Sequence, residues 1–419
     1  MGHFIEMHFL QETGIQGWGR DDSLSIKSVN FGGTMRDYYS SQCDNFYLRK
    51  NLSSEVGEYS AELFSASRTK QFIDALLATA EKMKNAGELS SGEYDQAKSN
   101  LEAWKKNKNA AVKKATKSKG KKVPATSDGD SLELSEDGGS SSVDEEVIDD
   151  SDAKTGKSGK VLKDVMTFLG GNGLRNAVKD VASKPALSAD DKNNVRLTAL
   201  KHVDASIALF GRMVADAEAG DTISDSRYLR VDGALSTSFA VTTHRSRRSV
   251  DYFSTVDDFS PNAGSGFLGG KSFTNGVYYR CKVLDLDKLI DNLYDLAGWS
   301  VEDILRACRD LFYALLNTSP KSTTTKMSGA NTHINYVIAN YRDHGHAKSF
   351  FDAFSKAVED DDCLSKSKER LEAFAKKDID HVAVFDISRD EKIADGHNRF
   401  VDAVMQVVES VVKEKVASK

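Results

Sequence analysis

The 419-residue chain contains a low-complexity segment, residues 105–160, that restricts which folds the whole chain can adopt. Residues 105–126 contain nine Lys and no acidic residue, whereas residues 127–153 contain eleven Asp or Glu and no basic residue. Such a stretch has too few apolar side chains to offset the entropy lost on ordering, so we expect it to be disordered. Attraction between its oppositely charged halves leaves a loose hairpin as the alternative.

The residues on either side carry strand and helix patterns. Residues 3–10 alternate, which places Ile5, Met7 and Phe9 on one face of a strand. Residues 11–42 contain five Gly and are expected to form loops. Helical patterns cover residues 57–104, with a break at residues 87–92 and a shorter helix after it, and then residues 160–182, 188–206, 285–317, 346–359 and 390–416. Alternation predicts further strands near residues 239–243, 277–283, 334–338 and 381–387.

This order of elements predicts an α+β fold whose β-rich core is split by a helical insertion. An RRM-like, or ferredoxin-like, arrangement is the natural candidate for that core. We expect residues 1–50 and 203–419 to form the core and residues 51–202 to form the insertion.

Composition argues against several classes of protein. The four Cys residues form no C-x-x-C pair, which disfavours a disulfide framework or structural zinc and favours reduced thiols. The N-terminus lacks a signal-peptide pattern, and no apolar run is long enough to span a bilayer. We therefore expect a cytoplasmic protein with no membrane partner. The formal net charge of −6 gives no support for RNA binding, which must rest on local patches.

Nucleotide and metal motifs are incomplete. Gly270-Lys271-Ser272 resembles the end of a P-loop, but Ser265 stands where that pattern requires Gly, so a flexible loop at a hairpin tip is expected instead. His344 and His346 have no third ligand at a suitable spacing, and a surface loop is expected there. We expect no cofactor and no metal site.

Two segments near the N-terminus place polar groups beside predicted strands. In Arg20-Asp21-Asp22 the adjacent carboxylates point apart on an extended chain, so we expect them to cap backbone N–H groups and orient Arg20. Phe31-Gly32-Gly33 is either an ordinary glycine turn or a loop that lets backbone approach a phosphate. The hydrogen-bond donors that follow it are Arg36, Ser40, Ser41 and Gln42.

A third segment, His244-Arg245-Ser246-Arg247-Arg248, is a compact basic cluster. Tyr252 and Phe253 follow it closely. Basic groups beside aromatic rings suit a phosphate backbone and an exposed base, whereas a solvated turn next to core aromatics is the alternative.

Several motifs follow one another in an order that resembles that of a known protein family. They are Arg20-Asp21-Asp22, Phe31-Gly32-Gly33, Ser40-Ser41-Gln42, Ala208–Met213, Val231–Ala234, Thr242-Thr243-His244, Asp251-Tyr252-Phe253, Val256-Asp257-Asp258 and Gly276–Arg280. As a set they resemble the backbone subunit of the type I-E CRISPR surveillance complex Cascade, the CasC family. The likeness covers residues 1–50 and 200–290 and continues more weakly to about residue 360.

The resemblance implies a non-catalytic, hand-shaped protein with an RRM-like palm, a helical fingers insertion and a hairpin thumb at about residues 244–276. Copies of such a subunit polymerise along the CRISPR guide RNA beside other Cascade subunits. Each thumb displaces a guide base at regular intervals, and the intervening bases pair with target DNA. Base pairing then reads the sequence, and the protein reads backbone and shape.

The resemblance also implies RNA-binding residues. It assigns guide-phosphate contacts to Arg20, Ser40, Gln42 and Arg49, with Arg36 in the same set. It places Arg212 and Met213 beside the guide, with Met213 as an apolar wedge. It puts His244, Arg245 and Phe253 in the thumb, Phe253 near the displaced base. Thr323 and Lys326 are further expected phosphate contacts.

The chain departs from the family pattern where basic residues are expected after Phe31-Gly32-Gly33. The residues found there are mostly Thr34, Met35, Asp37, Tyr38 and Tyr39, which leaves Arg36, and Asn45 stands where the resemblance leads one to expect a basic residue. Two rival functions remain open. One is a type III-like backbone subunit that cleaves target RNA with a metal ion and a loop aspartate, Asp22 or Asp37. The other is a small-molecule hydrolase that uses Asp21 and Asp22.

Overall fold

The computed structural model describes residues 2–54, 59–119, 166–214, 226–256, 258–259, 265–320, 327, 330, 332–378, 381–389 and 392–419. The chain forms two compact units. The larger unit comprises Met1–Lys70, Val165–Asp180 and Ser188–Lys419, and the smaller comprises Gln71–Asp164 and Val181–Leu187. No helix of the described ranges combines the length and the apolar character that a membrane crossing requires.

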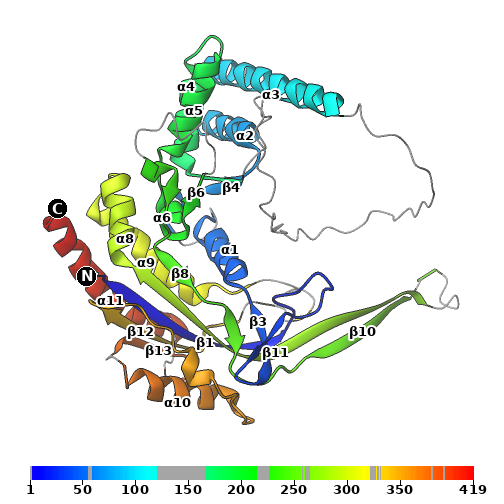
Figure 1. Ribbon diagram of the computed structural model, residues 1–419, viewed down its shortest axis with the longest axis vertical. Helices are drawn as coiled ribbons and strands as arrows, with labels where there is room; N and C mark the ends of the chain where they lie inside the picture. The colour runs from blue at the N-terminus through cyan, green and yellow to red at the C-terminus, as the bar shows by residue number, and fades with distance from the viewer. Residues whose placement is uncertain are drawn as a thin grey trace. The chain divides into compact units, whose positions relative to one another are not determined.

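An antiparallel sheet forms the base of the larger unit (Figure 1). Its strands in the described residues are β1 (Phe4–Gln16), β2 (Ser28–Phe31), β3 (Thr34–Tyr39), β8 (Leu235–Thr237), β9 (Ala240–Thr242), β10 (Ser249–Val256), β11 (Ser265–Asp285), β12 (Tyr336–Arg342) and β13 (His381–Asp386). The strand order is β13-β12-β1-β11-β9-β3-β2, and β8 and β10 also pair with β11. The α+β class expected from the sequence is confirmed, whereas the RRM-like assignment stays a prediction.

Alternation along β1 divides the apolar core between the two faces of the sheet. Ile5, Met7 and Phe9 join one buried cluster with residues of α1 (Ser41–Leu52), α9 (Val301–Asn317) and α11 (Ile393–Ala417). Leu10 joins a second cluster with residues of η4 (Phe351–Phe354) and α10 (Cys363–Ala375). Because successive side chains of a strand point to opposite faces, a single sheet serves both cores.

Shorter elements complete the larger unit. Its remaining helices in the described residues are η1 (Ala61–Phe64), α4 (Gly171–Ala182), α5 (Ala189–Leu200), α6 (Ala205–Phe210), η2 (Ser226–Tyr228), α8 (Leu286–Ile290) and the π-helical turn η3 (Asp291–Leu296). Two small ribbons pair β4 (Ser67–Thr69) with β5 (Thr167–Leu169) and β6 (Arg212–Met213) with β7 (Arg230–Val231). These ribbons carry Arg68, Phe168 and Met213.

The smaller unit is helical. Helices α2 (Phe72–Asn85) and α3 (Ser91–Lys119) bury the apolar side chains Ile73, Leu76, Ala80, Met83, Ala97, Leu101 and Trp104. Phe72 and Trp104 meet edge to face, with ring centres 6.1 Å apart. Ser90 and Glu93 form reciprocal hydrogen bonds that begin α3.

The structure corrects several sequence expectations. The chain within residues 11–42 is not mainly loop, because β1 continues to Gln16 and a β2–β3 hairpin follows. The helix expected over residues 346–359 is only the short 3₁₀ turn η4, and α10 was not anticipated. Helix α3 runs through Lys119, so the start of the segment expected to be disordered is helical, and residues 120–160 lie outside the described residues.

Candidate nucleic-acid interface

The loop that carries Arg20 packs beside the start of α1. Gly19 has φ +61°, and a Cβ there would lie 2.5 Å from the Tyr38 carbonyl oxygen. The Lys27 amide donates to the Gly19 carbonyl at 2.6 Å, and the Tyr38 amide donates to the Lys27 carbonyl at 3.1 Å. The structure therefore brings the Arg20 loop next to Tyr38, two residues before Ser40, although the two motifs are separate in the sequence.

Arg20 fastens this loop to strand β11. Its Nη2 donates to the Ser272 carbonyl at 2.7 Å, and its Nη1 donates to the Leu24 carbonyl at 2.5 Å. Asp21 Oδ1 accepts from the amides of Ser23 and Ser25, so the expected capping role is confirmed for Asp21. Contacts within the chain thus already use two of the Arg20 donors, and its contact with RNA stays a prediction.

Helix α1 begins with polar side chains. The Ser40 hydroxyl accepts from the Cys43 amide at 3.3 Å, which makes Ser40 the N-cap, and Gln42 is exposed on the first turn. The amide groups of the first turn and the positive end of the helix dipole favour an anion at this position. Ser40 and Gln42 therefore lie on a surface that suits a phosphate, and their contact with it stays a prediction.

Arg49, in the last turn of α1, shares an aromatic ring with a second arginine. The guanidinium carbon of Arg49 lies 5.4 Å from the centre of the Phe168 ring, and that of Arg68 lies 5.1 Å from the same ring. Burial, followed by the charge of Arg68, lowers the pKa of Arg49 to about 10, so Arg49 remains charged at neutral pH. Because the two like charges repel each other, a bound phosphate would relieve that repulsion.

Arg212 and Met213 are adjacent in β6 but differ in role. The buried Arg212 guanidinium donates to the backbone carbonyls of Phe168, Leu200, His202 and Tyr228. Carbonyls of its own chain accept from its Nη1 and Nη2 groups, and the expected place of Arg212 beside the guide stays a prediction. Met213 exposes 69% of its surface, as an apolar wedge would need.

Close backbone packing between Gly211-Arg212-Met213 and Asp232-Gly233 holds this exposed methionine in place. Gly211 has φ +77°, and a Cβ there would lie 3.0 Å from both the Val231 carbonyl and the Gly233 amide. A Cβ on Gly233 would lie 2.7 Å from the Leu209 carbonyl. The two motifs interlock backbone against backbone and so fix Met213 in the β6–β7 ribbon.

Arg36 and His244 are buried and have structural partners. Arg36 donates to the Thr242 carbonyl at 3.0 Å and to the Phe354 carbonyl at 3.3 Å. His244 Nε2 accepts from the Val277 amide at 3.1 Å, and its Nδ1 lies 2.7 Å from the Arg245 carbonyl. Burial and hydrogen bonds within the chain give both side chains structural partners, and their expected contacts with RNA stay predictions.

Strands β10 and β11 form a long hairpin that extends beyond the rest of the sheet (Figure 1). Pairing runs from Ser249 opposite Phe273 to Val256 opposite Ser265. The exposed apolar side chains on this hairpin are Val250, Tyr252, Phe253, Phe267 and Leu268. Arg245 is exposed just before it. This is the segment in which a thumb was expected; Thr323 and Lys326, the other expected contacts in this half of the chain, lie outside the described residues.

Two glycine motifs have structural explanations. Gly269-Gly270-Lys271-Ser272 lies inside strand β11, not in a tip loop, and a Cβ on Gly269 would meet the rings of Phe253 and Phe267. Gly32 and Gly33 both have positive φ and connect β2 to β3 as a two-residue hairpin turn. The ordinary-turn interpretation of Phe31-Gly32-Gly33 is therefore favoured over backbone approach to a phosphate.

Asp37 anchors the base of the hairpin. This buried carboxylate accepts from Ser246 Oγ at 2.6 Å, Arg248 Nε at 2.7 Å and Thr274 Oγ1 at 2.7 Å. Both of its oxygens therefore have partners, which disfavours Asp37 as the metal-binding aspartate of an RNA-cleaving site. Among the described residues, no three His, Cys, Asp or Glu side chains gather as metal ligands would.

We expect Asp37→Asn to loosen this hairpin. The amide cannot accept from all three donors, and a lost charge-assisted hydrogen bond costs about 1–3 kcal/mol. In hydrogen exchange by mass spectrometry, amides of β10 should exchange roughly 5- to 150-fold faster, whereas those of β1 and β12 should not change. Ser246→Ala removes one donor and should have a smaller effect. Unaltered exchange in β10 would refute the anchoring role of Asp37.

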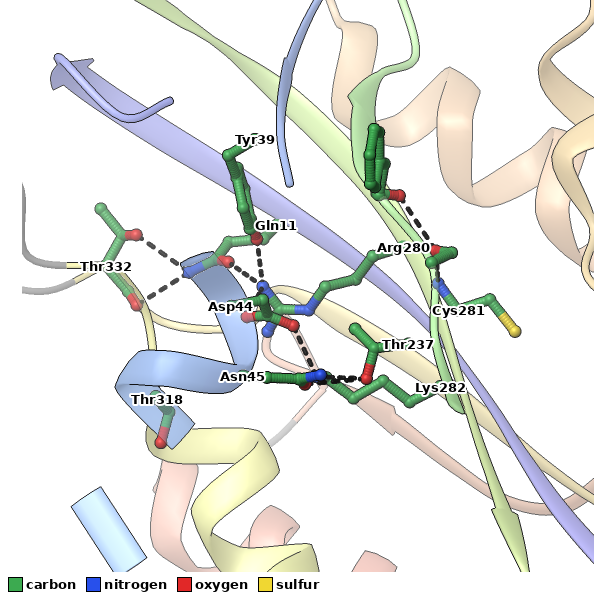
Figure 2. A network of polar contacts seen from close by, with 12 residues as sticks. Gln11, Tyr39, Asp44, Asn45, Thr237, Arg280, Cys281, Lys282, Thr318 and Thr332 are labelled. Atoms are coloured by element: carbon green, nitrogen blue, oxygen red, sulfur yellow. Dashed lines mark hydrogen bonds and ion pairs between the residues drawn. The ribbon is translucent and has the colours of Figure 1, made fainter. Parts of the chain in front are cut away.

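Beneath α1 lies a buried charge cluster that sequence inspection did not anticipate (Figure 2). Asp44, on the inner side of α1, has its Oδ2 2.5 Å from Lys282 Nζ and its Oδ1 3.6 Å from Arg280 Nη1. All three side chains are buried. Burial alone raises the pKa of the Asp44 carboxyl, but attraction to Arg280 and Lys282 outweighs burial and leaves that pKa below its ordinary value.

Further polar groups connect this cluster to several strands (Figure 2). Arg280 donates to Gln11 Oε1 of β1 at 3.0 Å and to the Tyr39 hydroxyl of β3. Lys282 donates to Asn45 Oδ1 at 3.4 Å and to Thr237 Oγ1 of β8 at 3.3 Å. The cluster therefore fixes α1, and with it the turn that presents Ser40 and Gln42, against the sheet.

Two solved structures share this fold. One, described as "CRISPR RNA-guided surveillance complex, pre-nicking", contains a chain that is 21% identical with a TM-score of 0.61, and the match covers 97% of this chain and 100% of that chain. Another, described as "CRISPR RNA-guided surveillance complex", contains a chain that is 18% identical with a TM-score of 0.53, over 96% of this chain and 99% of that chain.

No curated protein matches this chain in sequence. The model of one protein family, described as CT1975-like protein, matches residues 5–394 and thus almost the whole chain, including the Arg20 loop, α1, the β6–β7 ribbon and the β10–β11 hairpin. The chain belongs to the family of CT1975-like proteins.

Proposed function

We propose that this protein is a non-catalytic, guide-RNA-binding backbone subunit of a Cascade-type CRISPR complex. The observation that carries the proposal is the full-length fold match to a chain of a CRISPR RNA-guided surveillance complex, which covers 97% of this chain and 100% of the other. A match that covers both whole chains supports a shared structural role, whereas a match to one core domain would support only a shared domain. In this proposal the protein acts in the cytoplasm.

Each part of the structure has a role in this proposal. The sheet of the larger unit is the palm, the helical unit of α2 and α3 forms the fingers, and the β10–β11 hairpin is the thumb. Successive copies polymerise along the guide RNA beside other Cascade subunits, and the exposed guide bases pair with target DNA. Exposed apolar surface on the hairpin, where Tyr252 exposes 76% and Leu268 exposes 75% of its area, suits a segment that becomes covered on assembly.

The RNA contacts divide into charged and apolar groups. Arg49 and Arg68, gathered on Phe168, are suited to a phosphate, as are Gln42 and the first turn of α1. Met213 and Phe253 supply apolar surface for unstacking or covering a base. Because the phosphate contacts carry no sequence information, binding should depend strongly on salt and weakly on guide sequence.

We expect Arg49→Ala to weaken RNA binding equally for guides of different sequence. Loss of one phosphate contact to single-stranded RNA should reduce the slope of log K against log salt concentration by about 0.7. Arg309→Ala is the matched control, because it removes an exposed arginine of α9 that pairs with Asp402 of α11. Fluorescence anisotropy across a salt series gives both slopes. Equal slopes for wild type and Arg49→Ala would remove Arg49 from the interface.

A further inference from the structure

Two aromatic rings, one exposed and one half-buried, form a parallel stack near the start of α1. The rings of Tyr38 and Phe239 are inclined by only 2° to each other, and their centres are 5.3 Å apart. Phe239 still exposes 44% of its surface. An offset parallel stack leaves ring surface uncovered, and each uncovered ring is a flat apolar area of the size of a nucleobase.

The surrounding chain holds this pair rigidly. Tyr38 lies in β3, directly opposite Val241 of β9. Ser238, just before Phe239, exchanges two hydrogen bonds with Cys281, through its amide at 2.9 Å and its hydroxyl at 2.8 Å. The segment is also tied to α1, because Thr237 Oγ1 donates to Asn45 Oδ1 at 2.9 Å. Both rings are therefore fixed before any ligand arrives, which reduces the entropy cost of stacking.

Packing of the core does not account for an exposed phenylalanine at this position. The neighbouring Tyr39 and Ala240 are fully buried, and together with Trp18 and Tyr278 they form the local apolar cluster. Phe239 lies outside that cluster. A polar residue in place of Phe239 would leave the cluster intact, so the exposed ring points to a role at the surface.

Basic residues are few in the segment that leads into α1. Between Thr34 and Leu48 the chain has a single basic residue, Arg36, and that residue is buried. An RNA that approaches the first turn of α1 therefore meets hydrogen-bond donors and the helix dipole, with Lys27 of the adjoining loop as a nearby cation whose charge reaches Cys43. Stacking of a base on an aromatic ring can add affinity beyond that of the phosphate contacts.

We propose that Tyr38 and Phe239 form a stacking platform for an unpaired base of the guide RNA whose backbone follows the first turn of α1. This inference rests on the proposed RNA-binding function and adds one specific contact to it. Tyr38 is two residues from the N-cap Ser40, a separation of about 7 Å in extended chain, so a single nucleotide can present its phosphate to α1 and its base to Phe239. Every base has a π face, so the platform accepts all four.

Three substitutions of Phe239 test the platform in the full chain bound to guide RNA. Phe239→Leu keeps an apolar side chain but removes the flat ring, and it should weaken RNA binding roughly 5- to 150-fold, the equivalent of 1–3 kcal/mol. Phe239→Ala should bind RNA at least as weakly as Phe239→Leu, and Phe239→Trp should retain wild-type affinity. The slope of log K against log salt concentration should equal that of the wild type in all three variants, because no charge is removed.

A spectroscopic measurement reports the stack directly. Guide RNAs that carry one 2-aminopurine at successive positions should show quenched fluorescence at a base seated on Phe239, and Phe239→Leu should restore emission there. Wild-type affinity and unchanged quenching in Phe239→Leu would overturn the platform and leave the proposed function standing. A wild-type chain that binds no guide RNA would overturn both. If Phe239→Leu weakened association between chains without RNA and left RNA binding unchanged, Phe239 would be a protein contact and the platform would be wrong.

Discussion

Asp44→Ala is expected to lower the free energy of unfolding by about 3–5 kcal/mol, since it removes the carboxylate that two buried cations share. Lys282 Nζ and Arg280 Nη1 lie 2.5 and 3.6 Å from its oxygens, and all three side chains are buried. Without Asp44, two positive charges would remain under α1 with only neutral partners. Urea unfolding followed by circular dichroism measures the loss.

Two control variants isolate the cause. Asp74→Ala removes a carboxylate of similar size from an exposed pair with Lys105, and it should cost about 0–1 kcal/mol. Adding Lys282→Met to Asp44→Ala removes one stranded cation, so the double variant should be more stable than Asp44→Ala alone. A loss below about 1 kcal/mol for Asp44→Ala would contradict the role given to the buried charge cluster.

The pH dependence of this difference follows from the lowered pKa of Asp44. A carboxyl whose pKa is depressed by folding contributes stability above its unfolded pKa, and that contribution disappears as pH falls through the folded pKa. The difference between wild type and Asp44→Ala should therefore be constant from pH 8 to pH 5 and narrow only below about pH 4.

Gly32→Ala is expected to be the second severe change. Gly32 has φ +61°, and a Cβ there would lie 1.5 Å from the Ser355 carbonyl oxygen. The left-handed conformation costs a residue with a Cβ about 1–2 kcal/mol. Displacement of the backbone at Ser355 adds about 1–3 kcal/mol as an overpacking cost. The variant should unfold at a lower urea concentration and lose contact between the β2–β3 turn and η4.

Gly33→Ala is the matched control within the same turn. Gly33 has φ +77°, but no heavy atom lies within 4 Å of the position its Cβ would take. It should therefore show only the conformational cost of about 1–2 kcal/mol. If the two variants were equally destabilised, close approach to Ser355 would not explain why glycine occupies position 32.

Alternation and periodicity predicted the regular parts of this fold. Ile5, Met7 and Phe9 share a buried face as expected, and α11 (Ile393–Ala417) covers the expected helix. Helix α10 escaped prediction because its buried stripe includes Cys363, Ser367 and Ala375, which are too small or polar to give an apolar period.

The buried ionic groups could have been suspected from one signal. Arg280 and Lys282 occupy alternate positions of a strand whose other residues, such as Tyr279 and Cys281, are buried on the opposite face. When charged residues alternate along a strand that is buried on both faces, a buried partner of opposite charge is expected. Sequence alone could not identify that partner as Asp44, because the pairing depends on how α1 packs on the sheet.

Three of the residues expected to contact RNA also have structural partners that the sequence did not reveal. Arg36, Arg212 and His244 donate to, or accept from, backbone groups of distant segments. Backbone carbonyls and amides occur at every position, so a sequence gives no sign of which ones a side chain will meet. Gln42 and Met213, by contrast, are exposed where the motifs placed them.

The central claim, that this chain is a guide-bound backbone subunit, is tested most directly by purifying the full chain at low salt from cells that also express its neighbouring genes and CRISPR array. Co-eluting RNA should be sequenced, and the mass of the complex measured. We predict RNA of uniform length with repeat and spacer sequence, bound to several copies of the chain. Protein that elutes without RNA, with all partners present, would contradict the account.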